Sequence, residues 1–574
     1  MFIVLADAFP NAVRTGGASA ESYLFSCSPP VRTAPDAQVA GNYKHFTPIG
    51  VSLQLCSLVL LVCVLSVSVV AQKRSTRAAS QTLPNDSSEA RIASLLKEGK
   101  IDEAEREARS LVAAKPRDAQ AHALLGAILD QRGLAEEAEK ELRLAVKLDP
   151  GSAGSLTNLA VLLVRTKRTD EALTLFKRVV RIDPDHLQAN YNLALLYASR
   201  KEYKAAIPLL ERLLSLRGGP EHADIEFLLI LADSYAHAAQ HDDTTRVVSL
   251  LEQRAGSDPR VLFTLALALA DAGVYQRAAE LFRRTNELRP NTYEVLYNLG
   301  VALISLNKLD EAQNVLREAA TLRPDEADVF YRLGVVASAK GETENALGLW
   351  QRAVQLRPAF PAVYFMMAEE LVKNKRNETA ITFYKRALEH DQSQPAYFIR
   401  LGQAHVRARR WVEAREIFEQ ASARFPDNAS TYYYVGYALR GQGDFGAATK
   451  AFERSLQLQP NNADALASLG FLATERGHNE EAERLLRRAL LVDPKNYPAT
   501  YDLGRLLVRL RRYKEALPIL ERGATLSVDD PGVHYQLFLA NSRLGQKEAA
   551  DKHLARFKSL EESRKQREEG GSAP

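Results

Sequence analysis

Polar and apolar residues alternate along most of the chain with the spacing of amphipathic helices. Between residues 293 and 321, apolar residues recur three and four positions apart in two runs, one ending near Leu306 and one beginning near Leu309. This spacing gathers the apolar residues on one face of each helix. Asn307, between the runs, tolerates the left-handed conformation that ends many helices. The pattern therefore predicts a helical hairpin.

This hairpin pattern recurs with a period of 34 residues, except for one interval of 38 between Ala194 and Ala232. Its clearest sign is a small residue in the first helix, which we call the marker. The markers are Gly126, Ala160, Ala194, Ala232, Ala266, Gly300, Gly334, Ala368, Gly402, Gly436, Gly470 and Gly504. A second small residue usually follows 12 positions later, as Ala312 follows Gly300. Small residues let the two helices approach closely, and a large side chain would overpack the contact by about 1–3 kcal/mol.

The residues between and after the hairpins support the same interpretation. Glycine stands at the expected turn in many hairpins, where a positive φ costs it little. These glycines are Gly133, Gly273, Gly341, Gly443, Gly477 and Gly545. A proline closes many units, as Pro290 and Pro324 do, and proline cannot continue a helix.

The self-similarity resembles the tetratricopeptide repeat, a helix-turn-helix unit of 34 residues. The phrases Tyr297-Asn298-Leu299-Gly300 and Asp310-Glu311-Ala312 carry the resemblance, which covers about residues 85–564. It implies an all-α fold, an α-solenoid superhelix of about 14 repeats in which each unit packs only on its neighbours.

The phase of the pattern sets the boundaries of the expected units. They are 85–118, 119–152, 153–186, 187–224, 225–258, 259–292, 293–326, 327–360, 361–394, 395–428, 429–462, 463–496, 497–530 and 531–564. The four extra residues of 187–224 are expected in a loop near Arg217–Pro220. The last unit has Phe538 in the marker position and is expected to cap the array, followed by a charged tail at 565–574.

The N-terminal part of the chain has a different character. Residues 1–48 show no sustained periodicity and are interpreted as disordered or absent from the mature protein. Residues 49–71 carry no charge and are long enough to span a bilayer as one hydrophobic N-terminal helix. They are either a transmembrane anchor, with the repeats on the extracytoplasmic side, or a signal-peptide core cleaved near Ala71 to give a secreted or periplasmic protein. Residues 72–84 form a polar linker.

Composition narrows the chemistry. The net charge of +4 is spread along the chain and does not favour a nucleic-acid partner. All three cysteines precede the repeats, so the array has no disulfide framework and no thiolate zinc site. His237 and His241 stand four apart, but a helix is expected to end between them, so they are interpreted as solvated turn residues and no metal site or cofactor is predicted. The repeats occupy 85–564 and leave no room for a catalytic domain, so no enzymatic activity is predicted.

The resemblance implies that the first helix of each hairpin lines an inner groove. Candidate groove residues lie two positions before the marker and one, four and five positions after it. They are Asn158, Asn192, Asn298, Val301, Arg332, Arg400, Arg407, Arg440, Arg505 and Arg509. The asparagines resemble a ladder that grips peptide backbone in related repeats, although other residues interrupt it. The arginines gather towards the C-terminal third, where the groove would suit an extended peptide with an acidic portion.

The predicted function is a non-catalytic scaffold for protein–protein interaction, exported or anchored in a membrane through residues 49–71, that binds peptide segments of partner proteins. An alternative is a regulatory or substrate-recruiting subunit of a separately encoded enzyme such as a glycosyltransferase.

Overall fold

The computed structural model describes residues 88–570, with side chains to residue 566, and these residues form helices and turns without a β-strand. The helices fall into two compact units, divided between Pro324 and Asp325. We call residues 88–324 the first unit and residues 325–570 the second unit. The predicted segments 1–48, 49–71 and 72–84 lie outside the described residues. Within 88–570, none of the helices combines the length and the apolar character needed to cross a bilayer.

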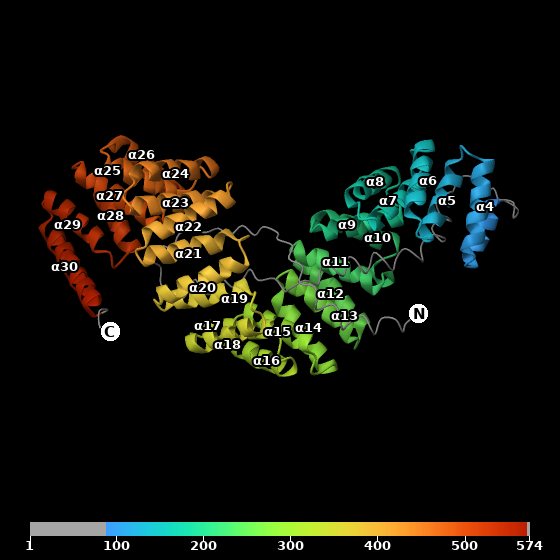
Figure 1. The fold of residues 1–574 in the computed structure, drawn as a ribbon, viewed down its shortest axis with the longest axis horizontal. Helices are drawn as coiled ribbons and strands as arrows, with labels where there is room; N and C mark the ends of the chain where they lie inside the picture. The colour runs from blue at the N-terminus through green and yellow to red at the C-terminus, as the bar shows by residue number, and fades with distance from the viewer. Residues whose placement is uncertain (1–87, 571–574) are drawn as a thin grey trace. The chain divides into compact units, whose positions relative to one another are not determined.

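The first unit contains fourteen α-helices in hairpins, drawn from blue to green in Figure 1. They are α3 (Ser88–Lys97), α4 (Ile101–Ala114), α5 (Ala119–Gln131), α6 (Ala135–Leu148), α7 (Ala153–Arg165), α8 (Thr169–Ile182), α9 (Leu187–Ser199), α10 (Tyr203–Leu216), α11 (Ile225–His237), α12 (His241–Ala255), α13 (Pro259–Asp271), α14 (Tyr275–Leu288), α15 (Tyr293–Ser305) and α16 (Leu309–Leu322). The predicted hairpin at 293–321 is confirmed to within one residue.

The second unit contains a further fourteen α-helices, drawn from yellow-green to red in Figure 1. They are α17 (Ala327–Ala339), α18 (Thr343–Leu356), α19 (Pro361–Lys373), α20 (Asn377–His390), α21 (Pro395–Arg407), α22 (Trp411–Arg424), α23 (Ala429–Gly441), α24 (Phe445–Leu458), α25 (Ala463–Glu475), α26 (Asn479–Val492), α27 (Tyr497–Arg509), α28 (Tyr513–Leu526), α29 (Pro531–Arg543) and α30 (Lys547–Gly570).

Each hairpin pairs an odd-numbered helix, here called an A helix, with the following even-numbered B helix. Each A helix packs on its own B helix, and many also contact the A helix of the next hairpin, as α5 contacts α7 and α25 contacts α27. Where these contacts run on from hairpin to hairpin, the A helices form a layer. This layer carries the positions at which the sequence predicts a groove.

The turn inside each hairpin adopts a left-handed conformation, as predicted. Every predicted turn glycine and Asn307 has a positive φ. The corresponding residue of other hairpins is neither glycine nor asparagine, which the sequence pattern did not identify. These residues are Lys167, Lys201, Ala239, Lys375, Arg409 and Arg511, with φ between 59° and 63°. The hairpin geometry therefore imposes this conformation even on side chains that disfavour it.

The marker residues pack against a large B-helix side chain 16 positions later. A Cβ atom on Gly300 would lie 2.5 Å from Leu316 Cγ, and one on Gly334 would lie 2.3 Å from Trp350 Nε1. The sequence predicts a close approach of the two helices where both Gly300 and Ala312 lack bulk. Ala312 is fully buried, but the atoms nearest to Gly300 belong to Leu316. A side chain at Gly300 or Gly334 would therefore meet the bulk of the other helix.

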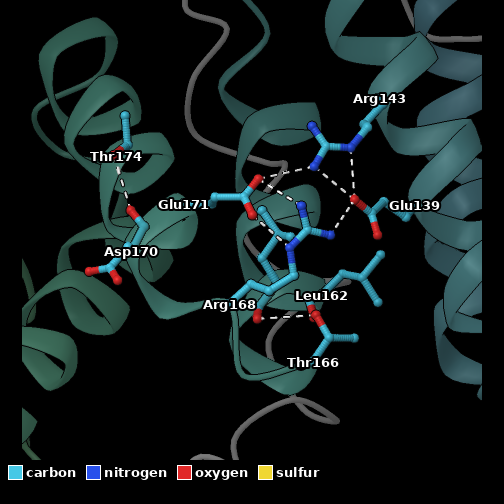
Figure 2. A network of polar contacts seen from close by, with 9 residues as sticks. Glu139, Arg143, Leu162, Thr166, Arg168, Asp170, Glu171 and Thr174 are labelled. Atoms are coloured by element: carbon cyan, nitrogen blue, oxygen red, sulfur yellow. Dashed lines mark hydrogen bonds and ion pairs between the residues drawn. The ribbon is translucent and has the colours of Figure 1, made fainter.

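Neighbouring B helices are joined on their polar sides by ion pairs, as Figure 2 shows between α6 and α8. The Arg168 guanidinium donates to Glu171 on its own hairpin (2.6 Å) and to Glu139 on the preceding one (2.7 Å), and Arg143 lies 3.1 Å from Glu171. The same positions hold the same residue types in the second unit. There they are Glu483, Arg487, Arg512 and Glu515, in and beside α26 and α28.

The interval of 38 residues between Ala194 and Ala232 contains the predicted loop. Gly218 and Gly219 have positive φ, and Pro220–His222 forms a 3₁₀ turn, η2, before α11 begins. At the C-terminus, α30 has 24 residues where other B helices of the second unit have 14. It continues to Gly570, so the first part of the expected tail at 565–574 is helical.

Candidate functional site

Two of the predicted groove arginines meet over one aromatic ring in the second unit. The guanidinium carbons of Arg440 on α23 and Arg505 on α27 each lie 5.4 Å from the centre of the Phe471 ring on α25. Arg440 also lies 5.1 Å from the centre of the Tyr437 ring. Three successive A helices thus supply one group, which we call the Arg440–Arg505 cluster. Stacking on aromatic rings holds a guanidinium while leaving its edge donors available.

Carboxylates on the same face balance part of this charge. Arg505 Nη2 lies 2.9 Å from Glu475 Oε1 and 3.5 Å from Asp502 Oδ1. Asp502 is 8% exposed, and burial raises its pKa to about 6 against the opposing effect of the two arginines. The Arg440 guanidinium forms no hydrogen bond or ion pair within the described part of the chain, and the buried Nε of Arg505 likewise lacks a hydrogen-bond acceptor there. The cluster therefore keeps donors that these carboxylates do not use.

A second polar chain links α19, α21 and α23. Arg400 lies 3.4 Å from Glu369 Oε1, and its Nη1 donates to Gln403 Oε1 at 3.2 Å. Gln403 Nε2 in turn donates to the Tyr434 hydroxyl at 2.8 Å, and the Tyr384 hydroxyl donates to Glu369. Arg400 therefore has partners on α19 and on its own helix.

The other predicted arginines make different contacts. Arg509 donates to Thr474 O (2.9 Å) and to Asn479 Oδ1 (2.5 Å), so it ties α27 to the preceding hairpin. Arg407, at the end of α21, is exposed. Arg332 is only 6% exposed and lies beside the Tyr331 ring, with 5.2 Å between guanidinium carbon and ring centre. These three arginines therefore have different surroundings: Arg509 is bonded to the preceding hairpin, Arg332 is nearly buried, and Arg407 is exposed.

In the first unit, predicted groove residues form hydrogen bonds within their own A helix or are buried in its packing. Asn192 and Asn298 donate their side-chain amides to Gln188 O (2.8 Å) and Glu294 O (2.7 Å), each one turn back in its own helix. Asn158 is half-buried, and Val301 is 5% exposed. Val301 therefore contributes to packing and leaves little surface for a ligand.

His237 also differs from its predicted role as a solvated turn residue. Its Nδ1 lies 3.2 Å from Asp233 Oδ1, its Nε2 lies 3.2 Å from Asp271 Oδ2, and its ring stacks on Tyr203 with 4.2 Å between centres. Burial lowers its pKa, but the two carboxylates outweigh burial and raise it to about 10. Its charged ring joins α11 to α13, whereas His241 is exposed at the start of α12. A set of three side chains able to hold a metal ion does not occur among residues 88–566.

The aromatic half of the cluster was not predicted from the sequence. Phe471 and Tyr437 stand one position after the marker, at an offset already expected to face the groove. Only apolar and basic residues were selected at that offset, so the two rings were overlooked. A search for aromatic residues flanked by arginines one hairpin away would have found Phe471.

The hairpin period, the small markers and the layered A helices define a helical-repeat protein. Two family models, both described as tetratricopeptide repeat, match residues 90–153, 163–225, 269–333 and 331–540, together more than half of the chain. The chain belongs to the tetratricopeptide repeat family. No curated protein matches it.

Several solved structures are similar to this chain. Yeast Tom70 is 16% identical, with a TM-score of 0.36, over 75% of this chain and 96% of that one. The C-terminal part of a TPR repeat-containing protein from Cytophaga hutchinsonii is 20% identical, with a TM-score of 0.38, over 42% of this chain and 99% of that one. YrrB, titled as a TPR protein with an unusual peptide-binding site, is 21% identical, with a TM-score of 0.29, over 33% of this chain and 97% of that one.

Proposed function

We propose that the protein is a non-catalytic scaffold that binds acidic, extended segments of partner proteins on the A helices of the second unit. The observation that carries the proposal is the Arg440–Arg505 cluster, in which Phe471 supports two guanidinium groups from different hairpins. Arginine donors in a fixed orientation recognise carboxylates in pairs. The two guanidinium carbons each lie 5.4 Å from the centre of the same ring, so neighbouring carboxylates on one ligand segment can reach both.

The chemistry of the cluster favours specificity over strong binding. Glu475 already occupies part of the Arg505 guanidinium at 2.9 Å, so an incoming carboxylate must displace it or share it. Arg440 has no such competitor in direct contact within residues 88–566. We therefore assign the first ligand carboxylate to Arg440 and the second to Arg505. Because these charges are partly exposed, binding should weaken as salt increases.

A direct binding measurement tests this function. Full-length protein in a mild non-ionic detergent is titrated into a fluorescein-labelled oligoglutamate peptide, and fluorescence anisotropy reports binding. Arg440→Ala combined with Arg505→Ala should weaken binding by about tenfold or more, the loss expected for two charge-assisted contacts. Arg487→Ala is the matched control, because Arg487 lies in the ion-pair network of the B helices. An oligolysine peptide controls for non-specific attraction.

If the double variant and the wild type bind the peptide equally well, this cluster is not the binding site. Loss of binding in Arg487→Ala as well would indicate a general effect of net charge and would equally overturn the proposal.

We also propose that residues 49–71 attach the scaffold to a membrane or direct its export. Support comes from the sequence alone: an uncharged stretch of bilayer length with basic residues on both sides. Carbonate extraction of membranes, with N-terminal sequencing of the mature protein, tests this. An anchored protein stays in the pellet with this segment intact, and a cleaved one begins near Gln72. A full-length protein in the soluble fraction would contradict both forms of the proposal.

A further inference from the structure

Asp502 lies at the centre of the charges in the Arg440–Arg505 cluster. It stands two residues before the marker Gly504, at the offset of the predicted asparagine ladder, yet its side chain is nearly buried. The charged groups that act on it are Arg505 on its own helix, Arg440 on α23 and Glu475 on α25. Helices α26, α28 and α29 also pack against α27, but their described residues add no charge to this set. Asp502 is therefore the least exposed of the carboxylates that neutralise the cluster.

The protonation state of Asp502 sets the charge that a ligand meets. As a carboxylate, it attracts both arginines and reduces the positive potential above them. As a neutral acid, it leaves both guanidinium groups balanced only by Glu475, whose side chain is 36% exposed and can swing away. An incoming carboxylate would then meet a stronger positive field in a partly desolvated place.

We propose that Asp502 is a proton-controlled competitor of the ligand, so that its protonation releases the Arg440–Arg505 cluster and acidic partner segments bind more tightly in mildly acidic conditions. This inference rests on the function proposed above and adds its regulation.

The titration of Asp502 supports a change in the right range. Burial raises its pKa to about 6; the two arginines lower the pKa and Glu475 raises it. A carboxylate bound beside Asp502 would raise its pKa further, so that binding takes up a proton. Glutamates of the ligand keep their charge in this range because their own pKa is about 4.3. An increase in affinity between neutral and mildly acidic pH therefore has to come from a group of the protein and not from the peptide.

The oligoglutamate titration is repeated at several values between about pH 5.5 and about pH 7.5, where Asp502 passes from mostly neutral to mostly charged. Wild-type affinity should rise by about tenfold as the pH falls, since the competent fraction of the protein increases. Asp502→Asn imitates the neutral acid and should bind tightly at both ends of the range. Isothermal titration calorimetry in buffers of different ionisation enthalpy should show proton uptake by the wild type and none by Asp502→Asn.

Asp464→Asn is the matched control. Burial also raises the pKa of Asp464 to about 6, but Asp464 accepts a hydrogen bond from Asn496 at 2.7 Å at the start of α25 and does not contribute to the cluster. This variant should keep the pH dependence of the wild type.

The possible outcomes separate the regulation from the function. If binding depends on Arg440 and Arg505 but is the same at every pH, Asp502 does not regulate it, and the proposed function still holds. If binding is unchanged when both arginines are replaced, the proposed function and its regulation by Asp502 are both wrong. A pH dependence that survives in Asp502→Asn, or disappears in Asp464→Asn, would place the titrating group elsewhere.

Discussion

The two units use equivalent positions of their A helices for different purposes. Two residues before the marker, the first unit places Asn192 and Asn298, which bond to their own helices. The second unit places Arg400 there, which pairs with Glu369 on α19, and Asp502, whose pKa is raised by burial and also responds to charges on α23 and α25 as well as on its own helix.

One residue after the marker, the first unit buries Val301. The second unit also buries Val335 at that offset, but its later hairpins place Tyr437, Phe471 and Arg505 there. Because the hairpins are alike in length and turn geometry, the fold does not determine these positions, and they are free to carry recognition.

The largest expected difference concerns the packing of the markers. Gly334→Ala would bring a Cβ to 2.3 Å from Trp350 Nε1, and that ring donates to Tyr331 O at 3.1 Å, so it cannot turn without losing a hydrogen bond. Gly300→Ala meets the flexible end of Leu316 instead. We expect a cost of about 3 kcal/mol for Gly334→Ala and about 1 kcal/mol for Gly300→Ala, the two ends of the range for overpacking.

Hydrogen exchange of the full-length protein, followed by mass spectrometry, measures the loss of local stability in α17–α18 for Gly334→Ala and in α15–α16 for Gly300→Ala. Both variants gain the same helix propensity, so their difference reports the clash. Equal costs would show that the tryptophan has as much freedom as the leucine.

Histidines give the two units opposite responses to pH. The pKa of His237 is raised to about 10, so its stabilising contribution is complete below the unfolded pKa of about 6.5 and is lost as pH rises through the folded value. Burial lowers the pKa of His534 and of His553, whose Nδ1 atoms are 3.1 Å apart. Nearby charge lowers both further: Arg556 acts on His534, and His534 acts on His553. The unfolded chain binds these protons more readily, so stability here falls as pH drops below about 6.5.

Moving from about pH 8 to about pH 6 should therefore stabilise α11–α13 by about 2 kcal/mol and destabilise α29–α30. Hydrogen exchange, corrected for the intrinsic dependence of the rates on pH, measures both changes in one sample. His237→Gln should abolish the first change only, and His553→Gln should reduce the second only. A shift of the same sign in both regions would mean that other groups dominate.

The sequence predicted the hairpins well because their determinants are local. A small marker, a turn residue and the apolar spacing lie within one unit of 34 residues, and α15 and α16 begin and end within one residue of the prediction. The pattern also contains the bulky residue 16 positions after each marker, but its role depends on how the two helices cross. That crossing is not visible in the spacing, so the contact of Gly300 with Leu316 was not predicted.

The candidate site was predicted less well because side-chain partners come from neighbouring hairpins. Nothing within the hairpin of Arg509 indicates that it bonds to Thr474 O, and nothing within that of Arg332 indicates its burial. The pairing of Glu475 with Arg505 likewise depends on the register of α25 against α27. The positions were predictable from the period, whereas the contacts required the packing.

Turn residues offer a smaller test that is also matched between the units. Ala239 in the first unit has φ +59°, where Gly477 in the second unit has φ +81°. Ala239→Gly should stabilise its hairpin by about 0.5–1 kcal/mol, since relief of the left-handed conformation exceeds the extra entropy of glycine in the unfolded chain. Gly477→Ala should destabilise by about 1 kcal/mol for the same reason. Urea unfolding monitored by exchange in α11–α12 and α25–α26 measures both. Destabilisation by Ala239→Gly would contradict the argument.

The smallest expected effect is the loss of stability when a glutamate of the B-helix ion-pair networks is replaced. This loss should be similar in the two units. Glu139 accepts from Arg143 and Arg168 in the first unit, and Glu483 accepts from Arg487 and Arg512 in the second. Because these pairs lie at the surface, Glu139→Gln and Glu483→Gln should each lower the urea midpoint slightly and by similar amounts. Both losses should vanish near 1 M salt, where the screening length is about 3 Å. If Glu483→Gln alone were costly, or if its effect persisted in salt, the B helices would also differ between the units, and the contrast would no longer be confined to the face that the A helices present.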